Sequence, residues 1–136
     1  MHGHDYAVKL QIAYHSKFFD HTLDFRIVNN LVKNIIEELD HKIILPGNSQ
    51  SMKILPERRG ENWHISILGK EYSFPKKDVK IIDDVEQTTC ENIARFLHKK
   101  ITMKLKEVDE SKALSHLTVI LSETEGNEVK YSSKIV

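Results

Sequence analysis

Apolar side chains occupy alternate positions in two stretches of this sequence, and this pattern constrains the fold more than any other feature. In residues 6–14 they alternate with polar or small side chains. In residues 117–121 they alternate again, and a turn at residues 125–127 leads into further alternation at residues 129–131. A period of two is typical of a strand with one buried face. The sequence therefore predicts a first strand and a closing antiparallel hairpin.

Two other stretches have apolar side chains at spacings of three and four residues, the period of an α-helix with one buried face. We expect the first helix to begin after Asp24, which can cap it, and to end near His41. The second is expected from about residue 91 to about residue 105. Thr88 and Glu91 stand at its start with the spacing of a capping box.

The segment between these helices contains another predicted hairpin. Apolar side chains alternate in residues 63–67 and 72–74, on either side of a turn at residues 69–70, and Pro75 closes the hairpin. The order strand, helix, hairpin, helix, hairpin indicates an α+β fold with the helices on one face of the sheet. Because 136 residues suffice for one core, we expect a single domain over residues 1–136.

The balance of charge argues against two classes of partner. Twenty basic residues balance twenty acidic ones, so no global positive field would attract nucleic acid or an anionic membrane. No apolar run approaches the roughly 20 residues that span a bilayer, and no signal-peptide pattern occurs. The single cysteine, Cys90, cannot form an internal disulfide. We expect a cytoplasmic protein whose partner is a small molecule or another protein.

His2 and His4 are candidates for a metal site. If they continue the strand that follows, side chains two residues apart point to the same face, and both imidazoles could reach one Zn2+ ion. The alternative is that both belong to a frayed chain end. Catalytic zinc usually takes three protein ligands, so such a site needs one more donor.

Asp40 and His41 are adjacent at the predicted end of the first helix. A carboxylate beside an imidazole can fix its tautomer and raise its basicity, which suits general acid/base catalysis. The alternative is a helix C-terminus whose cationic side chain complements the macrodipole.

Glu123 stands at the end of a strand with one buried face, next to a Gly-Asn turn. A carboxylate in this place can accept two parallel hydrogen bonds from the guanidine-like edge of a heterocycle. The alternative is a solvated carboxylate at a strand end.

Cys90 falls in the first turn of the second predicted helix. The positive end of the helix dipole lowers the pKa of a thiol there and favours the reactive thiolate, which makes Cys90 a candidate nucleophile. The alternative is a small apolar side chain in the core.

Five short motifs follow one another along the chain. They are His2-Gly3-His4-Asp5-Tyr6, Leu23-Asp24-Phe25, Leu39-Asp40-His41-Lys42, Thr88-Thr89-Cys90-Glu91-Asn92-Ile93-Ala94 and Glu123-Thr124. This ordered set resembles the 6-pyruvoyl-tetrahydropterin synthase family, which includes the 6-carboxy-tetrahydropterin synthases. The resemblance spans nearly the whole chain and is weakest from about residue 43 to about residue 86.

The resemblance implies the tunnelling fold, in which each subunit gives a four-stranded antiparallel sheet with two helices on one face. Sheets of neighbouring subunits join edge to edge into a barrel, commonly a trimer that stacks into a hexamer, with active sites between subunits. We therefore expect a homo-oligomeric β-barrel, a trimer or hexamer, which would satisfy strand edges that are otherwise exposed.

The resemblance also implies a reaction and a role for each candidate residue. The substrate is 7,8-dihydroneopterin triphosphate, zinc acts as a Lewis acid on its side-chain hydroxyls, and triphosphate elimination with internal redox gives the product. The implied roles are zinc binding by His2 and His4, acid/base catalysis by Asp40 and His41, and pterin binding by Glu123, Thr89 and the backbone around Cys90.

The sequence departs from the family pattern at the metal motif. The family's first strand, which carries a third zinc-binding His and the catalytic Cys, is expected before His2, and Cys90 does not match the catalytic position. Either the true start lies upstream of Met1, or the chain is a relative that has lost catalysis. Our main hypothesis is a zinc-dependent carbon-oxygen lyase of pterin synthesis. The alternative is a pterin- or purine-binding homologue with impaired catalysis.

Overall fold

The computed structural model describes residues 3–15, 17, 23–55, 60–124 and 126–135, apart from the side chain of residue 110. The chain divides into two compact units. Unit 1 comprises Met1–Ile35 and Thr89–Val136, and unit 2 comprises Ile36–Thr88. In sequence, unit 2 is thus an insertion between the two parts of unit 1. That residues 1–136 form a single domain stays a prediction.

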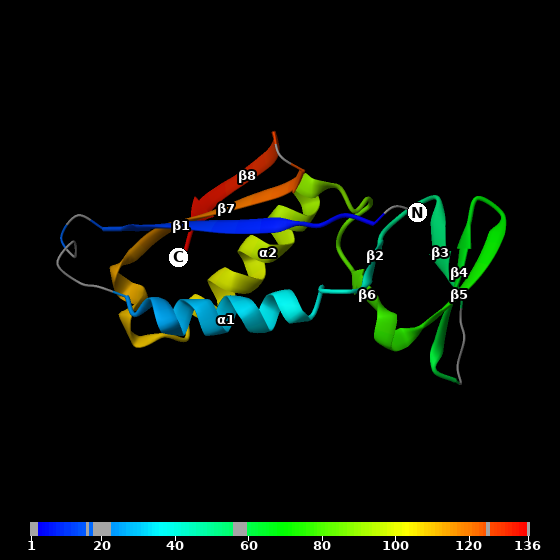
Figure 1. Cartoon of the computed structure of the whole chain (residues 1–136), viewed down its shortest axis with the longest axis horizontal. Coiled ribbons are helices and arrows are strands. Elements are labelled where there is room, and N and C mark those ends of the chain that lie inside the picture. The colour runs from blue at the N-terminus through cyan, green and yellow to red at the C-terminus, as the bar shows by residue number, and fades with distance from the viewer. Residues whose placement is uncertain (1–2, 16, 18–22, 56–59, 125, 136) are drawn as a thin grey trace. The chain divides into compact units, whose positions relative to one another are not determined.

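A three-stranded antiparallel sheet is the framework of unit 1 (Figure 1). Its strands are β1 (Ala7–Tyr14), β7 (Leu114–Thr124) and β8 (Asn127–Lys134), with β7 in the centre. Exposed and half-buried side chains alternate along β1, as expected for a strand with one inner face. The predicted first strand and closing hairpin are therefore confirmed. Glu125, in the predicted turn, lies outside the described residues.

The helix α2 (Cys90–Leu105) packs against β7 and β8, and its apolar side is buried. One polar ring lies within this packing. His98 is 5% exposed, and its Nε2 lies 2.9 Å from the carbonyl oxygen of Leu117. Its Nδ1 lies 3.5 Å from Oγ1 of Thr102, and its ring meets that of Tyr131 edge to face. A short 3-10 helix, η3 (Asp109–Ala113), leads from α2 toward β7.

The N-terminus of α2 is capped by Thr89. Its Oγ1 accepts a hydrogen bond of 3.2 Å from the backbone amide of Asn92, which satisfies one of the free amides of the first turn. The predicted capping box of Thr88 and Glu91 is therefore wrong by one residue. Only Thr88 has a glutamate three residues later, but the structure caps the helix with the adjacent Thr89.

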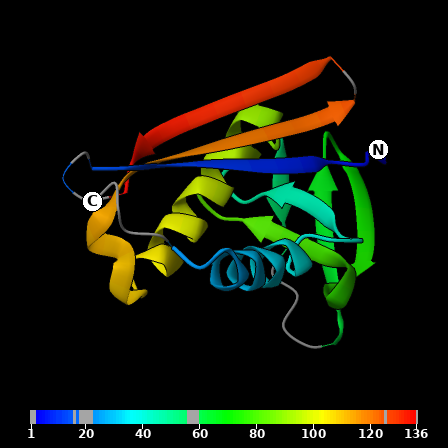
Figure 2. The same cartoon turned by 60° about the vertical axis from the view of Figure 1, so that its left-hand side comes forward.

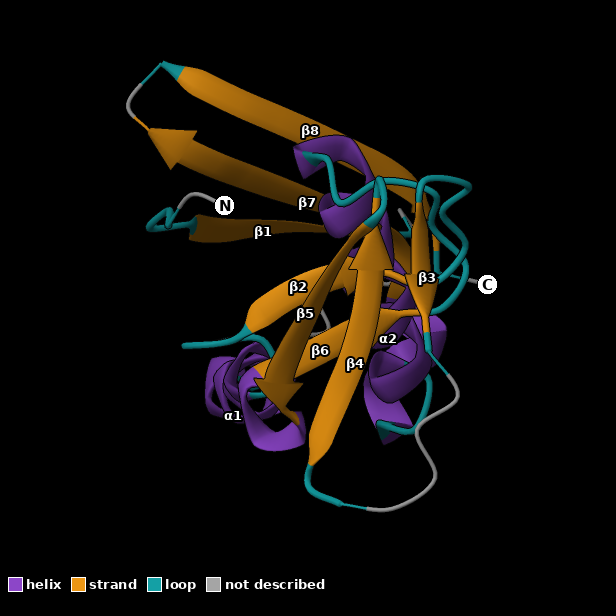
Figure 3. Ribbon diagram, turned by 90° about the vertical axis from the view of Figure 1, so that its right-hand side faces the viewer, coloured by secondary structure: helices purple, strands orange, loops and turns teal. Residues whose placement is uncertain are grey.

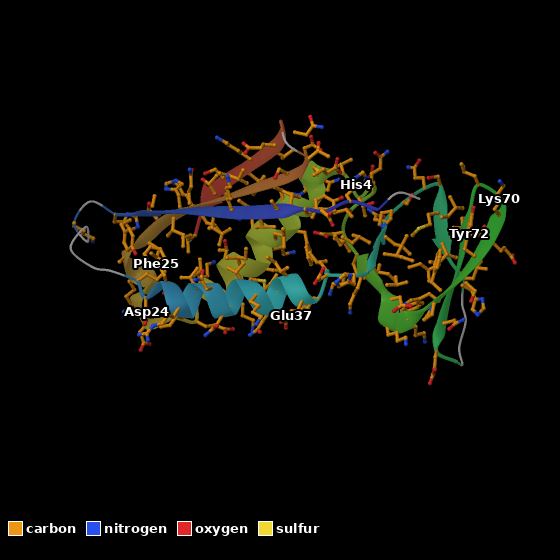
Figure 4. The ribbon with its side chains drawn as sticks, viewed as in Figure 1. His4, Asp24, Phe25, Glu37, Lys70 and Tyr72 are labelled. Atoms are coloured by element: carbon orange, nitrogen blue, oxygen red, sulfur yellow. The ribbon has the colours of Figure 1, made fainter. Side chains whose placement is uncertain are left out.

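The helix α1 (Phe25–Glu37) begins where the sequence predicts it. A carboxylate oxygen of Asp24 accepts a hydrogen bond of 2.9 Å from the amide of Arg26, and Figure 4 shows Asp24 and Phe25 at the start of the helix and Glu37 at its end. The helix ends earlier than predicted, because a turn carries the chain from there to His41. Figure 2 shows α1 and α2 on the same side of the β1-β7-β8 sheet, in agreement with an α+β fold.

In unit 2, β3 (Met52–Ile54), β4 (Asn62–Ile67) and β5 (Lys70–Pro75) form an antiparallel sheet (Figure 3). β4 and β5 are the predicted hairpin. Its two-residue turn is Leu68-Gly69, with positive φ at both residues, rather than the predicted positions 69–70. A leucine in this conformation is unusual, because a β-carbon disfavours positive φ.

Two further strands of unit 2, β2 (Ile43–Pro46) and β6 (Val79–Ile82), pair in parallel. The short 3-10 helix η2 (Lys76–Asp78) precedes β6. These strands were not predicted, because each has only four residues, too few to show a period that distinguishes strand from helix. Leu45 of β2 and Val79 of β6 pack with Met52 and Ile65 in the core of unit 2. In the described part of the chain, no helix combines the length and apolar character needed to cross a bilayer.

Candidate functional site

The carboxylate of Glu123 lies at the end of the central strand of unit 1. The pairing of β7 with β8 shifts register between Ser122 and Thr124, so Glu123 is the extra residue of a β-bulge. Bulges often redirect a side chain next to functional sites. On the other side of β7, Ala7 pairs with Ser122, and the next step of this antiparallel register places Tyr6 opposite Glu123. Glu123 is half-buried.

Tyr6 contacts this carboxylate directly. Its hydroxyl donates a hydrogen bond of 3.3 Å to Oε1 of Glu123. Burial, followed by the negative charge of Glu123, raises the pKa of Tyr6 to about 12. The hydroxyl therefore keeps its proton and remains a donor at neutral pH. The sequence placed Tyr6 in a predicted strand and in a motif, but it did not predict a contact with Glu123. Pairing of the first strand with the strand that contains Glu123 would have indicated this contact.

Cys90 is the second neighbour of Glu123. Its thiol donates a hydrogen bond to the carboxylate, and its pKa is raised to about 12, first by burial and then by the hydrogen bond and charge of Glu123. The expected lowering of the Cys90 pKa by the helix dipole is therefore wrong, because burial and a neighbouring anion outweigh the dipole. Cys90 is a protonated donor at neutral pH and is not an activated nucleophile.

Thr89, predicted to bind the pterin together with the backbone around Cys90, is half-buried beside it at the start of α2. Its oxygen accepts the capping hydrogen bond from Asn92. A hydroxyl also has one proton to donate, so capping does not use all of its hydrogen-bonding capacity. Thr89, Cys90, Glu123 and Tyr6 all belong to unit 1.

The predicted metal site is only partly within the described chain. His2 lies outside the described residues, and His4 precedes β1, which begins at Ala7 (Figure 4). The ring of His4 meets that of Tyr6 edge to face, with centroids 6.0 Å apart. Among the described residues, no group of three or more His, Cys, Asp or Glu side chains is placed to hold a metal ion. The described chain therefore does not supply the three ligands that catalytic zinc requires.

Asp40 and His41 lie in unit 2, in the turn that follows α1. Nε2 of His41 is 3.7 Å from Oδ2 of Asp40, and both side chains are mainly exposed, at 94% and 61%. This distance suits an ion pair with a protonated imidazole but exceeds that of a hydrogen bond. His41 also has a positive φ of 56°, which few non-glycine residues adopt.

Comparisons with known proteins agree on one family. Residues 1–134 match the family model described as 6-pyruvoyl tetrahydropterin synthase. A protein of Methanocaldococcus jannaschii, provisionally named 6-carboxy-5,6,7,8-tetrahydropterin synthase, is 35% identical over 109 residues, which are 79% of this chain and 65% of that protein. The match thus spans slightly less than two thirds of that relative's length.

A more distant relative and a solved structure extend the match. The 6-carboxy-5,6,7,8-tetrahydropterin synthase of Aquifex aeolicus is 23% identical over 135 residues, covering 98% of this chain and 75% of that protein. The crystal structure of 6-pyruvoyl tetrahydropterin synthase from Plasmodium vivax is similar with a TM-score of 0.80 at 25% identity. It covers 98% of this chain and 81% of that one.

Proposed function

Because this chain belongs to the 6-pyruvoyl tetrahydropterin synthase family, we propose that it is a lyase of tetrahydropterin synthesis that acts on 7,8-dihydroneopterin triphosphate. The geometric observation that supports the proposal is the half-buried Glu123 carboxylate at the β7 bulge. A carboxylate held in this way suits the paired N–H donors on the edge of a pterin ring.

In the proposed site, Glu123 and Thr89 bind the pterin ring. The carboxylate accepts from the ring's N–H groups, and the Thr89 hydroxyl, with the backbone around Cys90, supplies further polar contacts. Hydrogen bonds to an ionised partner are stronger than neutral ones. Glu123 would therefore contribute more to ligand affinity than Thr89.

We assign proton transfer to the Asp40–His41 pair. The carboxylate of Asp40 lies 3.7 Å from Nε2 of His41, and in this proposal His41 accepts a proton from the substrate side chain and returns it later in the reaction. The overall reaction eliminates triphosphate and redistributes electrons within the substrate, so it needs no external oxidant. The exposure of both side chains leaves them accessible to a ligand.

We also propose that His2 and His4 are two ligands of a zinc ion. Imidazole is a usual zinc ligand, but two donors fall short of the three that catalytic sites take, so this chain's described residues do not complete the set. When bound, the ion would supply Lewis-acid activation of the substrate hydroxyls.

A homo-oligomer, trimer or hexamer, completes the proposal. Within the described residues, β1 and β8 each pair only with β7, so each has one open edge in this chain. Open edges favour pairing with another sheet, and edge-to-edge pairing of subunits would cover them. Location in the cytoplasm and the lack of a nucleic-acid partner stay predictions.

The experiment that tests this function is incubation of the purified protein with 7,8-dihydroneopterin triphosphate and excess zinc. We expect release of triphosphate and formation of a tetrahydropterin product, and chromatography measures both. Glu123→Gln should weaken binding of the pterin neopterin by at least about tenfold, whereas Glu128→Gln, in the exposed part of the same hairpin, should leave it unchanged. Binding of neopterin without turnover would support the non-catalytic alternative, and absence of both would contradict the proposed function.

A further inference from the structure

Two side chains from opposite parts of the sequence converge on Glu123. The hydroxyl of Tyr6, just before β1, donates to Oε1 at 3.3 Å. The thiol of Cys90, the first residue of α2, donates to the same carboxylate. Within unit 1, the carboxylate thus receives one donor from the residue that precedes β1 and one from the first residue of the helix packed on the sheet.

We propose that Tyr6 and Cys90 are positioning residues that hold the Glu123 carboxylate in the orientation that binds the ligand. This inference rests on the proposed function of the site, since it assumes that Glu123 accepts hydrogen bonds from a pterin. An ionised carboxylate has about four acceptor sites. Two donors from the protein leave enough of them for a ligand that offers a pair of N–H groups.

The backbone around each donor is itself held in place. Tyr6 adjoins Ala7, the first residue of the β1–β7 ladder. Cys90 follows the N-cap Thr89, so its position is tied to the first turn of α2. A glutamate side chain has many rotamers in solution, and fixing one before the ligand arrives lowers the entropic cost of binding.

The nature of the donors suits this role. A phenol and a thiol are neutral donors, so they hold the carboxylate without cancelling its charge, as a lysine or arginine would. The negative charge therefore remains available to the ligand. Glu91, the acidic neighbour of Cys90, adds negative charge and does not compete as a donor.

The test compares dissociation constants for neopterin by calorimetry in Tyr6→Phe, Cys90→Ala and Cys90→Ser. We expect Tyr6→Phe and Cys90→Ala each to weaken binding about three- to tenfold, the usual effect of one lost hydrogen bond. Cys90→Ser keeps a donor and should bind nearly as the wild type does. Tyr72→Phe is the matched control, because Tyr72 lies on β5 in unit 2 and stacks on Phe74.

A second arm uses the same substitutions in a Glu123→Gln background. If Tyr6 and Cys90 act through the carboxylate, neither substitution should weaken the residual binding further, whereas a general loss of structure would reduce it in both backgrounds. If Glu123→Gln weakens binding but Tyr6→Phe and Cys90→Ala leave it unchanged in the wild-type background, the positioning role is refuted and the proposed function stands. If the wild-type protein binds no neopterin, the proposed function fails, and the positioning role with it.

Discussion

The imidazole of His98 joins α2 to the central strand of unit 1, because its Nε2 lies 2.9 Å from the carbonyl oxygen of Leu117. A carbonyl only accepts, so Nε2 must carry the proton and Nδ1 is left to accept from the hydroxyl of Thr102. Both ring nitrogens therefore have a hydrogen-bond partner, although the ring lies in a mainly apolar interface. Its role is structural, which makes it distinct from the other histidines considered above.

We predict that His98→Ala lowers the free energy of unfolding by about 2–3 kcal/mol, since it leaves a cavity and removes a buried hydrogen bond. Urea unfolding of the whole chain measures this. His116→Ala is the control, because His116 is exposed and its Nδ1 bonds the neighbouring Ser115 hydroxyl. That variant should change stability by less than about 0.5 kcal/mol. Equal effects of the two substitutions would show that the buried contacts of His98 do not contribute to the free energy of unfolding.

Cys90 provides a direct chemical report on the site. Its pKa is about 12, raised from the ordinary value of 9.0, so in the folded protein at pH 8.5 little thiolate is present. Iodoacetamide, which reacts with the thiolate, should therefore modify the folded chain at least about tenfold more slowly than the chain unfolded in urea. Glu123→Gln should accelerate the reaction, because it removes the negative charge that disfavours the thiolate. A rapid reaction in the folded wild type would contradict the contact.

The same shift predicts how stability depends on alkaline pH. The folded chain binds the Cys90 proton more tightly than the unfolded chain does, so this contribution to stability is complete below about pH 9. It is lost as the pH rises from 9 toward 12. The melting temperature of Cys90→Ala should therefore fall less steeply between pH 9 and pH 12 than the melting temperature of the wild type. Identical slopes in the two proteins would contradict the raised pKa.

Substitution of the Asp40–His41 pair should separate catalysis from binding. We predict that His41→Ala lowers kcat by about 100-fold or more, the range of general acid/base catalysis, while neopterin affinity stays within about twofold of the wild type. Asp40→Asn should give a smaller loss of kcat, because it removes a charge 3.7 Å from the imidazole but leaves the imidazole in place. Unchanged turnover in His41→Ala would remove this pair from the mechanism.

Zinc binding by the 136-residue chain should be weak. Two imidazoles, from His2 and His4, do not make the three-ligand set of a catalytic site, and the described residues contain no group of three or more His, Cys, Asp or Glu side chains placed to hold a metal. Atomic absorption after dialysis should thus give well below one zinc per chain, and turnover without added zinc should be absent or very slow. Stoichiometric zinc would mean that the ligands are other than those proposed.

The assembly is tested by light scattering at micromolar concentration. We predict a trimer or hexamer, because β1 and β8 each leave one edge open within the described part of unit 1. The molar mass should stay constant on dilution until the protein concentration falls to the dissociation constant of the oligomer. A monodisperse monomer would contradict the edge-to-edge arrangement.

Much of unit 1 was predictable because its signals are periodic. The alternation in residues 6–14 gave β1, and the three- and four-residue spacings gave both helices. The parallel pair β2 and β6 was missed, since each strand has only four residues, too few to show a period, and β6 has a lysine, Lys80, among its apolar residues. The turn of the β4–β5 hairpin was displaced by one residue, because Leu68 is not a residue type that predicts positive φ.

The candidate site was predictable as a set of residues but not as a set of contacts. Glu123, Thr89 and Cys90 were identified from their motifs, and the structure brings them together in unit 1. The role of Tyr6 depends on the register between β1 and β7, which no local pattern encodes. The pKa of Cys90 depends on burial and on Glu123, so the position of the residue in its helix alone gave the wrong direction.

The pairing of Ala7 with Ser122 has a consequence for how the protein comes to be folded on the ribosome. Among the described residues, β1 pairs with β7, which is synthesised about 100 residues later. Until then an apolar face remains open to chaperones and to other nascent chains. The described strands of unit 2 lie between residues 43 and 82, so each is close in sequence to the strand with which it pairs. Unit 2 can therefore fold before β7 has been synthesised and paired with β1.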